Sequence, residues 1–259
     1  MFFEKKLELA KKAAFEAGEA VMHYFKSSNF EIKNKSVNNP VTTADFEANN
    51  IIKEILMDDN SSFGWLSEET VDSKERLENE NVWVVDPIDG TKEFIEGVPH
   101  FSISIGMVRL GKPVIGVIYN PAKNELFTAF SGGGSKLNEE PINCLADGSD
   151  RSIVVSRSEI KRGLWNAYKN IFSNITPVGS VAYKLGLVAA GRSSLFATLQ
   201  PKNEWDICAG NCIVNEAGGA LLDLHGNKRL YNSNDTKIRP GLIAGHNDSI
   251  KEVLKTINT

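Results

Sequence analysis

The chain has few of the residues that mark secreted, membrane-spanning or disulfide-rich proteins. Three cysteines occur among 259 residues, Cys144, Cys208 and Cys212, which is too few for a disulfide framework in a chain of this size and favours a reducing compartment. No apolar run approaches the length of a membrane span, and residues 1–6 contain no signal-peptide core. We therefore expect a cytoplasmic protein with no membrane partner.

Excess positive charge and paired histidines are also lacking. The formal net charge is −4, so no basic surface for a nucleic acid polymer is expected. The four histidines are scattered and form no zinc-binding spacing. Cys208 and Cys212 lie four residues apart, and we expect small buried thiols there rather than a zinc site. An anionic substrate would therefore need its charge matched by bound metal ions.

Apolar residues are, in contrast, abundant enough for a large core. Hydrophobic residues make up 41% of the chain and charged residues 24%, as in ordinary globular proteins. Apolar residues at helical spacing predict helices over residues 3–25 and 42–57, and a strand-rich antiparallel meander follows them. The pattern then changes to alternating strands and helices. We expect an α+β or α/β layered sandwich, with residues 1–150 as an N-terminal part containing an antiparallel sheet and residues 151–259 as a C-terminal α/β part.

The same periodicities, with Gly and Pro at the turns, predict the remaining elements. A polar loop is expected at residues 33–40, and the boundary between the two parts near residues 145–151. Strands are expected at residues 82–85, 101–108, 114–119, 125–130, 152–156, 176–178, 195–198, 220–224 and 241–244. Helices are expected at residues 159–172, 180–190 and 206–217 and from about residue 248.

Two carboxylates stand close together in the segment Trp83-Val84-Val85-Asp86-Pro87-Ile88-Asp89-Gly90-Thr91. The apolar run delivers Asp86 to the end of a buried strand, and the following proline forces a turn. Asp89 then points back toward Asp86, and carboxylates so close repel each other unless cations lie between them. Oxygen ligands favour Mg²⁺ or Mn²⁺ over zinc, and the amides of Gly90 and Thr91 would face a phosphate. A plain turn is the alternative, since these residue types all favour turns.

Three further acidic residues lie in segments that suit the same chemistry. Asp206 follows Trp205 at the start of an expected helix, and Asp45 follows a Thr-Thr-Ala run in the same setting. For both, a simple helix cap is the alternative. The helix over 42–57 is expected to begin at Thr43 with Glu47 nearby, without strict capping-box spacing. Glu68 stands in Ser67-Glu68-Glu69, where a solvated charge pair is the alternative.

Two other polar features are expected to carry no chemistry. The run Gly132-Gly133-Gly134-Ser135-Lys136 lacks the spacing of a phosphate-binding P-loop and lies between expected strands, so it is interpreted as a turn. Lys5 and Lys6, and Lys74 with Arg76, are interpreted as solvated charges.

Taken together, the acidic segments resemble the signatures of the inositol monophosphatase family, the lithium-sensitive, magnesium-dependent phosphatases. Asp86–Thr91 matches the first signature without a gap. Trp205–Gly210, continuing to Glu216–Gly219, matches the second, and Pro40–Asp45 and Ser67–Glu69 fit two weaker blocks. The resemblance covers almost the whole chain in the expected order. It implies the αβαβα fold of the sugar phosphatases, a hydrolase acting on a small phosphorylated metabolite, lithium sensitivity and a homodimer.

The resemblance also implies metal ligands. Two or three Mg²⁺ ions are expected, with Mn²⁺ as an alternative. Glu68, Asp86 and the carbonyl of Ile88 would hold the first ion. Asp86, Asp89 and Asp206 would hold the second, so that Asp86 bridges the two. A third, weaker ion would share Glu68.

Catalytic and substrate-binding roles are implied in the same way. Thr91, hydrogen-bonded to Asp45 or Glu68, would orient a metal-bound water that attacks phosphorus in line with the leaving oxygen. Asp45 would be an outer group that orients this assembly. Ser180 also suits an ordinary N-cap. For Lys35, the alternative is a solvated lysine in a loop. The residues expected to bind substrate are Lys35, Asp89, Gly90, Thr91, Gly179, Ser180 and Asp206.

The substrate is less clearly indicated. Animal-type inositol monophosphatases have a glutamate seven residues before the second-signature aspartate, where it grips inositol hydroxyls, and this chain has Leu199 there. Thr91–Ile95 and Glu204–Asp206 look more like the 3′(2′),5′-bisphosphate nucleotidase branch, in which Lys202 would meet a second phosphate. Phe94–Ile105 resembles bacterial proteins of the general inositol-phosphatase type.

Several activities therefore stay open. An inositol or sugar monophosphatase and a nucleotidase acting on adenosine 3′,5′-bisphosphate are the two main hypotheses, with histidinol phosphate or fructose 1,6-bisphosphate as minor ones. A non-catalytic sensor of phosphorylated ligands is an alternative of another class. The complete set of acidic residues, together with Thr91, argues against the sensor.

Overall fold

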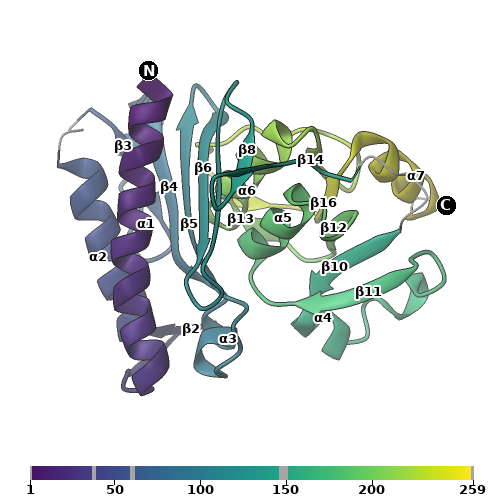
Figure 1. Ribbon diagram of the computed structural model, residues 1–259, viewed down its shortest axis with the longest axis horizontal. Coiled ribbons are helices and arrows are strands. Elements are labelled where there is room, and N and C mark those ends of the chain that lie inside the picture. Colours follow the sequence, from purple (N-terminus) through teal and green to yellow (C-terminus); the bar gives the residue numbers. More distant parts are fainter. Residues whose placement is uncertain (1, 37–38, 59–61, 146–150, 258–259) are drawn as a thin grey trace.

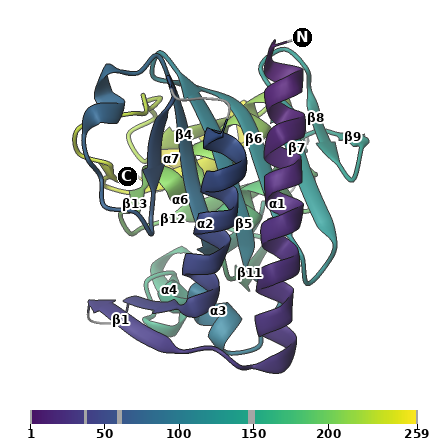
Figure 2. The same ribbon diagram turned by 90° about the vertical axis from the view of Figure 1, so that its left-hand side faces the viewer.

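The two large β-sheets and the helices around them form alternating layers (Figure 1). The computed structural model describes residues 2–36, 39–58, 62–145 and 151–257. Helices α1 (Phe2–Ser27) and α2 (Thr43–Met57) cover one face of a seven-stranded sheet, side by side in Figure 2. The expected layered α+β sandwich is confirmed. The expected domain boundary near residues 145–151 lies largely outside the described residues.

The seven-stranded sheet is built mainly from antiparallel neighbours. Its first pair, β3 and β4, is parallel. The strands, in spatial and chain order, are β3 (Gly64–Ser67), β4 (Asn81–Asp89), β5 (Ser102–Arg109), β6 (Lys112–Asn120), β7 (Glu125–Phe130), β8 (Ser135–Leu137) and β9 (Glu140–Ile142).

A bulge near the end of β4 changes the direction of its side chains. Asp86 pairs with Ser104 of β5, but Asp89 pairs with Ser102, so β4 advances by three residues while β5 advances by two. An extra residue of this kind bends the strand and re-aims its side chains. Pro87 lies within this step, where the missing ladder hydrogen bond of proline is tolerated. The bulge lies inside the acidic signature.

The second sheet has five strands in the order β11-β10-β12-β16-β14. Its side chains alternate between two cores, as strand periodicity requires. Val154 of β10 faces the cluster formed by α5 and α6, whereas Ile153 and Val155 face the cluster that includes α7. The strands are β10 (Ser152–Ser156), β11 (Asn174–Val178), β12 (Leu195–Thr198), β14 (Ala220–Asp223) and β16 (Leu242–Gly245), and α7 spans Asn247–Ile257.

Helices α5 (Val181–Ala189) and α6 (Glu204–Glu216) fill the layer between the two sheets. Their burial explains their small residues. A Cβ atom added to Gly116 of β6 would lie 2.3 Å from the carbonyl oxygen of Ala209, so α6 rests directly on the sheet backbone. Cys208 and Cys212 are buried on this helix, which confirms the expectation of buried thiols.

Shorter elements connect these layers. They are β1 (Ile32–Ser36), β2 (Asn39–Thr42), η1 (Glu75–Glu78), α3 (Thr91–Ile95), α4 (Arg157–Lys161), η2 (Asn166–Tyr168), β13 (Lys202–Asn203) and β15 (Lys237–Ile238). Strands β1 and β2 pair as a hairpin within the stretch expected to be a loop. In the part of the chain that the structure describes, no helix is both long and apolar enough to cross a lipid bilayer.

The prediction of a helix over residues 159–172 was wrong. Helix α4 ends at Lys161, and Gly163 takes a left-handed conformation with φ of 73°, which glycine adopts readily at a helix end. A side-chain contact stabilises this early helix end, because the indole of Trp165 can then donate a hydrogen bond to Glu159 Oε2 at 2.8 Å. Helical periodicity in the sequence could not show this contact.

Candidate metal and phosphate site

The acidic signature lies where β4 leaves the sheet. Asp86 is 2% exposed, and its Oδ1 accepts a hydrogen bond of 3.1 Å from the amide of Ile88. This bond closes the turn expected after the strand. The parallel neighbour β3 ends at Ser67, and the amide of Glu68 donates to the carbonyl of Val85. Glu68 is therefore held beside the end of β4.

Three carboxylates from distant parts of the chain meet at this point. Glu68, Asp86 and Asp206 each offer one oxygen, and these oxygens all lie within 4.8 Å of one another. Glu68 follows β3, Asp86 belongs to β4 and Asp206 lies in the first turn of α6. Asp89, also expected to be a ligand, is not a member of this group. Carboxylates that lie this close suit a hard divalent cation, whose preferred ligands are oxygens.

Asp45 and Asp206 occupy equivalent positions in their helices. Each is the third residue of its helix, and its carboxylate accepts a hydrogen bond from the backbone of the N-cap residue, as in a capping box. The Asp45 Oδ2 atom accepts from the amide of Thr42 at 2.7 Å, and the Asp206 Oδ2 atom accepts from the amide of Asn203 at 2.7 Å. The cap and the site thus use the same carboxylates.

Two expectations about these helix starts need correction. The cap of α2 is Thr42, paired with Asp45, and not Thr43 with Glu47. Helix α6 begins at Glu204, two residues earlier than predicted. In both cases a Thr or Asn three residues before the aspartate was the available signal, since an aspartate can take the place of glutamate in the box.

Asp89 is bound by the start of α5. Its Oδ2 atom accepts from Ser180 Oγ at 2.7 Å and from the amide of Ala182 at 2.6 Å. Ser180 has a positive φ of 54° and caps α5, accepting from the amide of Tyr183 at 2.9 Å. The expectation of an N-cap at Ser180 is confirmed, and Gly179 precedes it. These contacts bring Gly179 and Ser180 next to the acidic signature, although Ser180 lies 91 residues from Asp89 along the chain.

Thr91 lies between the carboxylate of Asp45 and the backbone of the signature. Its hydroxyl is 3.2 Å from Asp45 Oδ1 and 3.1 Å from the carbonyl oxygen of Ile88. Of the two acidic neighbours expected for Thr91, the one in contact is Asp45. The turn depends on Gly90, whose φ of 100° suits a residue without a Cβ atom.

Lys35 forms ion pairs at the edge of this acidic cluster. Its Nζ atom lies 2.7 Å from Glu68 Oε1 and 2.7 Å from Glu69 Oε1. Lys35 belongs to strand β1 and remains exposed, as a solvated lysine would be, but it is ion-paired with the two glutamates. The charges of Glu68 and Glu69 raise the pKa of Lys35 against the opposing effect of burial, so the ion pair is held by attraction at the edge of the cluster.

Burial and mutual repulsion make the site costly to keep ionised. Burial, followed by the charges of Glu68 and Asp89, raises the pKa of Asp86 well above its ordinary value. The pKa of Asp206 rises to about 7, from burial first and then from the charge of Asp89. Burial raises the pKa of Asp45 to about 6 and that of Glu69 to about 7. Bound cations would reverse these shifts, so the donor set fits metal ions.

Sequence reasoning missed two buried cations near the site. Lys184 of α5 is 2% exposed, and its ammonium group donates to the carbonyls of Val178 and Ser180 at 3.0 and 2.6 Å. Burial lowers the pKa of Lys184 to about 8. Arg76 was expected to be a solvated charge, but it is 1% exposed and its guanidinium bonds to Asp72, Asn232 and Ser233. Local sequence gives no signal for either, since lysine and arginine are usually exposed.

Other predicted features have simpler places. The expected turn is present at residues 132–134, where two amides donate to Glu216. Ser135 and Lys136, expected in the same turn, belong to strand β8. Leu199 packs against the core of the five-stranded sheet. Lys202 lies close enough to Asp206 for its charge to lower the pKa of that carboxyl, against the larger effect of burial.

Known proteins share this sequence pattern and fold. The model of the inositol monophosphatase family matches residues 4–256. An inositol-1-monophosphatase from Rhizobium meliloti is 32% identical over 97% of this chain and 95% of its own length. A 3′(2′),5′-bisphosphate nucleotidase CysQ from Shigella flexneri is 31% identical over 87% of this chain and 93% of its own. The structure of a Thermotoga maritima IMPase superposes with a TM-score of 0.86 at 28% identity, covering 98% of this chain and 97% of that one.

Proposed function

The chain belongs to the inositol monophosphatase family, and on this basis we propose that it is a Mg²⁺-dependent hydrolase of a small inositol or sugar monophosphate. The observation that supports this most directly is the convergence of Glu68, Asp86 and Asp206, with oxygens within 4.8 Å of one another. The two curated relatives described above bear the names of phosphatases. The chain is accordingly a phosphatase, and the proposal concerns its metal, substrate and mechanism.

We propose specific ligands for two Mg²⁺ ions, for which Mn²⁺ would substitute. Glu68, Asp86 and the Ile88 carbonyl would hold the first ion. Asp86, Asp89 and Asp206 would hold the second, and Glu68 would share a weaker third. The separate engagement of Asp89 Oδ2 by Ser180 and Ala182 fixes the orientation of that carboxylate. When bound, the ions would supply a nucleophile at neutral pH by lowering the pKa of water, and would offset charge on the departing oxygen.

The residues of the chain would orient the reacting groups and hold their protons. The hydroxyl of Thr91, held by Asp45 at 3.2 Å, would set the direction from which water attacks. Asp45 is kept in place by its two hydrogen bonds from Thr42. The amides of Gly90 and Thr91 would contact the phosphate, and Lys35 would lie over its outer side. Gly179 and Ser180 would contact the rest of the substrate, next to Asp89 and Asp206.

A nucleotidase acting on adenosine 3′,5′-bisphosphate is the second candidate. A cleft of about 750 Å³ lies between α3 and α4, and its lining includes Lys92, Arg157, Lys161 and Arg162. These cations outnumber the two glutamates in the same cleft, which suits a second phosphate. Leu199 favours the same candidate, since a packed leucine cannot hydrogen-bond inositol hydroxyls.

The test is phosphate release from a panel of monophosphates and bisphosphates. Inositol 1-phosphate and adenosine 3′,5′-bisphosphate would be compared with and without Mg²⁺, with Asp86→Asn as the inactive control. We expect turnover that requires Mg²⁺ and disappears in the variant, and the ratio of kcat/KM for the two substrates separates the candidates. Turnover unaffected by Asp86→Asn would contradict the mechanism, and tight binding without turnover would favour a phospho-ligand sensor.

Further parts of the proposal concern the protein as a whole. We propose a cytoplasmic location, which the free, buried cysteines support, and inhibition by lithium. A homodimer is proposed and would be tested by light scattering. We also propose a functional division near residues 145–151, in which residues 1–150 contribute most metal ligands and residues 151–259 contribute Asp206 and substrate contacts.

A further inference from the structure

A buried arginine helps to join two of the segments that carry metal-ligand candidates, those of Glu68 and Asp206. Arg76 lies in η1, and its guanidinium binds both carboxylate oxygens of Asp72 at 3.0 and 2.8 Å. The same guanidinium donates to Asn232 Oδ1 at 2.7 Å and to the carbonyl of Ser233 at 3.0 Å. In return, Asn232 Nδ2 donates to the backbone carbonyl of Arg76 at 3.0 Å. Residues 156 positions apart are thus held by hydrogen bonds in both directions.

The other side of the same loop is bound by the first residue of α6. Glu204 is 0% exposed, and its two carboxylate oxygens accept from the amides of Asn232 and Ser233 at 2.8 and 2.9 Å. The amide of Glu204 donates to the carbonyl of Thr236 at 3.0 Å. The loop over residues 232–236 therefore lies between Arg76 and Glu204 and bonds to each.

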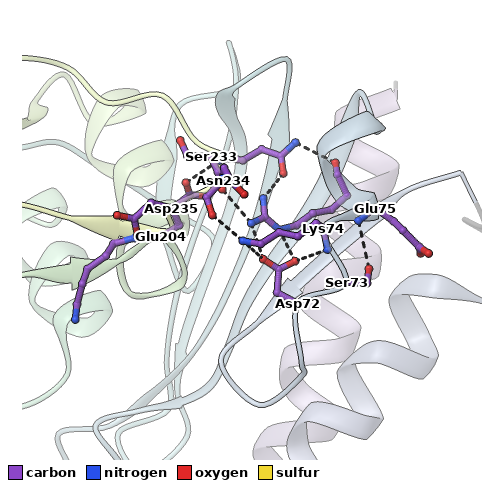
Figure 3. A network of polar contacts seen from close by, with 11 residues as sticks. Asp72, Ser73, Lys74, Glu75, Glu204, Ser233, Asn234 and Asp235 are labelled. Atoms are coloured by element: carbon purple, nitrogen blue, oxygen red, sulfur yellow. Dashed lines mark hydrogen bonds and ion pairs between the residues drawn. The ribbon is translucent and has the colours of Figure 1, made fainter.

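Figure 3 shows how these groups lie in space. The segment from Asp72 to Glu75 faces Ser233 and Asn234, and Glu204 lies on the far side of that loop. Lys74 adds a contact of 2.6 Å to the carbonyl of Asn234. The segment is also packed against the sheet, because a Cβ atom on Gly64 of β3 would lie 2.8 Å from Arg76 Cβ.

Two of the metal-ligand candidates, Glu68 and Asp206, lie a few residues from this network along the chain. Glu68 precedes Asp72 by four residues, and Asp206 follows Glu204 by two. Glu68 is tied to β4 on one side, and its segment is tied to the network on the other. Arg76 and Glu204 are buried, so a shift of the loop between them would leave a polar group of each without its partner.

We propose that Arg76, Asn232 and Glu204 form a lock that sets the position of Asp206 relative to Glu68, and that its purpose is metal affinity. The inference rests on the proposed metal site. Arg76 and Glu204 act as positioning residues, because neither belongs to the carboxylate cluster. Arginine suits the position, since its planar fork satisfies Asp72, Asn232 and Ser233 at once, which a lysine ammonium cannot do.

The test is Mn²⁺ binding to metal-free protein, measured by calorimetry. We choose Arg76→Lys, which keeps the charge, and Asn232→Gly, which removes the central side chain but tolerates the φ of 60° found at Asn232. Both variants are expected to weaken Mn²⁺ binding by about 10- to 100-fold, the usual effect of removing groups that support metal ligands. Arg76→Lys, Glu204→Gln and the double variant would also be compared. The double variant should lose less Mn²⁺ binding free energy than the two single variants together, since both residues act on the same loop.

Two controls separate this lock from general damage and from failure of the metal site. Arg109→Lys disturbs an exposed ion pair with Glu80 on the same sheet and should leave Mn²⁺ affinity unchanged. Asp206→Asn should weaken binding directly; if wild-type protein binds no Mn²⁺, or Asp206→Asn binds as wild type does, the proposed metal site is wrong. If Arg76→Lys and Asn232→Gly lower the melting temperature but keep wild-type affinity, the lock is purely structural and the inference is overturned.

Discussion

Among single residues, the carboxylates that define the site are unfavourable in the absence of cations. Asp86 is buried among Glu68, Asp89 and Asp206, and burial and these charges all raise its pKa. A residue kept in such surroundings opposes the stability of the metal-free fold. Function and stability therefore make opposite demands on Asp86.

Replacing Asp86 with Asn should reveal both demands. We expect a loss of kcat of at least about 10³-fold, because a metal ligand is lost. In EDTA the same variant should be more stable than wild type by about 1–2 kcal/mol, since the neutral amide removes repulsion and keeps the Ile88 hydrogen bond. Phosphate release and urea denaturation measure the two effects. A variant that is less stable than wild type in EDTA would show that repulsion among the carboxylates does not govern the stability of the metal-free fold.

The hydroxyl of Thr91 gives a second prediction for a single residue. Thr91→Ala removes the contacts with Asp45 and Ile88, and we expect kcat to fall by about 10²- to 10⁴-fold, as for lost proton-transfer and orienting groups. Thr91→Ser keeps the hydroxyl and should stay within about tenfold of wild type. Equal losses in the two variants would point to packing of the threonine methyl group rather than to its hydroxyl.

Among the secondary-structure elements, helix starts and one strand end build the site. Helices α2 and α6 each present an aspartate from a capping box, α5 binds Asp89 through its N-cap, and β4 contributes its bulge. Carboxylates near helix N-termini gain from the unpaired amides and the helix dipole there. These favourable local interactions help to offset the repulsion among the acids.

Close packing of α6 on the sheet should fix how far Asp206 lies from the seven-stranded sheet. Gly116→Ala would place a methyl group against the carbonyl of Ala209, which we expect to destabilise the fold by about 1–3 kcal/mol. The shifted helix should also bind Mn²⁺ more weakly. Gly18→Ala is the matched control, because it crowds Tyr119 from α1 and should affect stability without affecting Mn²⁺ affinity. If Gly116→Ala and Gly18→Ala bind Mn²⁺ with the same affinity, the distance between α6 and the sheet does not control metal binding.

Across the whole molecule, the raised pKa values link folding to pH and metal. The pKa of Asp206 is about 7 in the fold against an ordinary 3.8. Between pH 3.8 and about 7, Asp206 therefore keeps its proton in the folded protein but loses it in the unfolded chain. The stability contributed by Asp206 is present below about pH 4 and is lost as pH rises toward 7. Glu69 and Asp45, whose pKa values are also raised, act in the same direction.

Urea denaturation at pH 5.5 and pH 7.5 tests this linkage. In EDTA, the free energy of unfolding of wild type relative to Asp206→Asn should fall as pH rises, because the variant has no carboxyl at position 206 to ionise. Saturating Mg²⁺ should restore wild-type stability at pH 7.5 by mass action, and should restore the variant much less. A wild-type-to-variant difference that is independent of pH in EDTA would contradict the raised pKa of Asp206.

Local sequence was sufficient for most elements and for the chemical groups of the site. Strands β7, β10 and β12 have the predicted bounds, and the long helices α1 and α2 were found, because periodicity of apolar residues is a local property. The set of acidic residues could be named for the same reason, since each stands in a recognisable short segment.

How these residues meet depends instead on the folded layers. That Asp45 rather than Glu68 holds Thr91, that Ser180 binds Asp89, that Lys35 pairs with two glutamates and that Arg76 is buried all follow from contacts between segments far apart in the chain. The end of α4 at Lys161 depends likewise on the return of Trp165 to Glu159. Hydrogen bonds and charge interactions act over a few ångströms, and sequence spacing carries no information about which distant groups the fold brings that close.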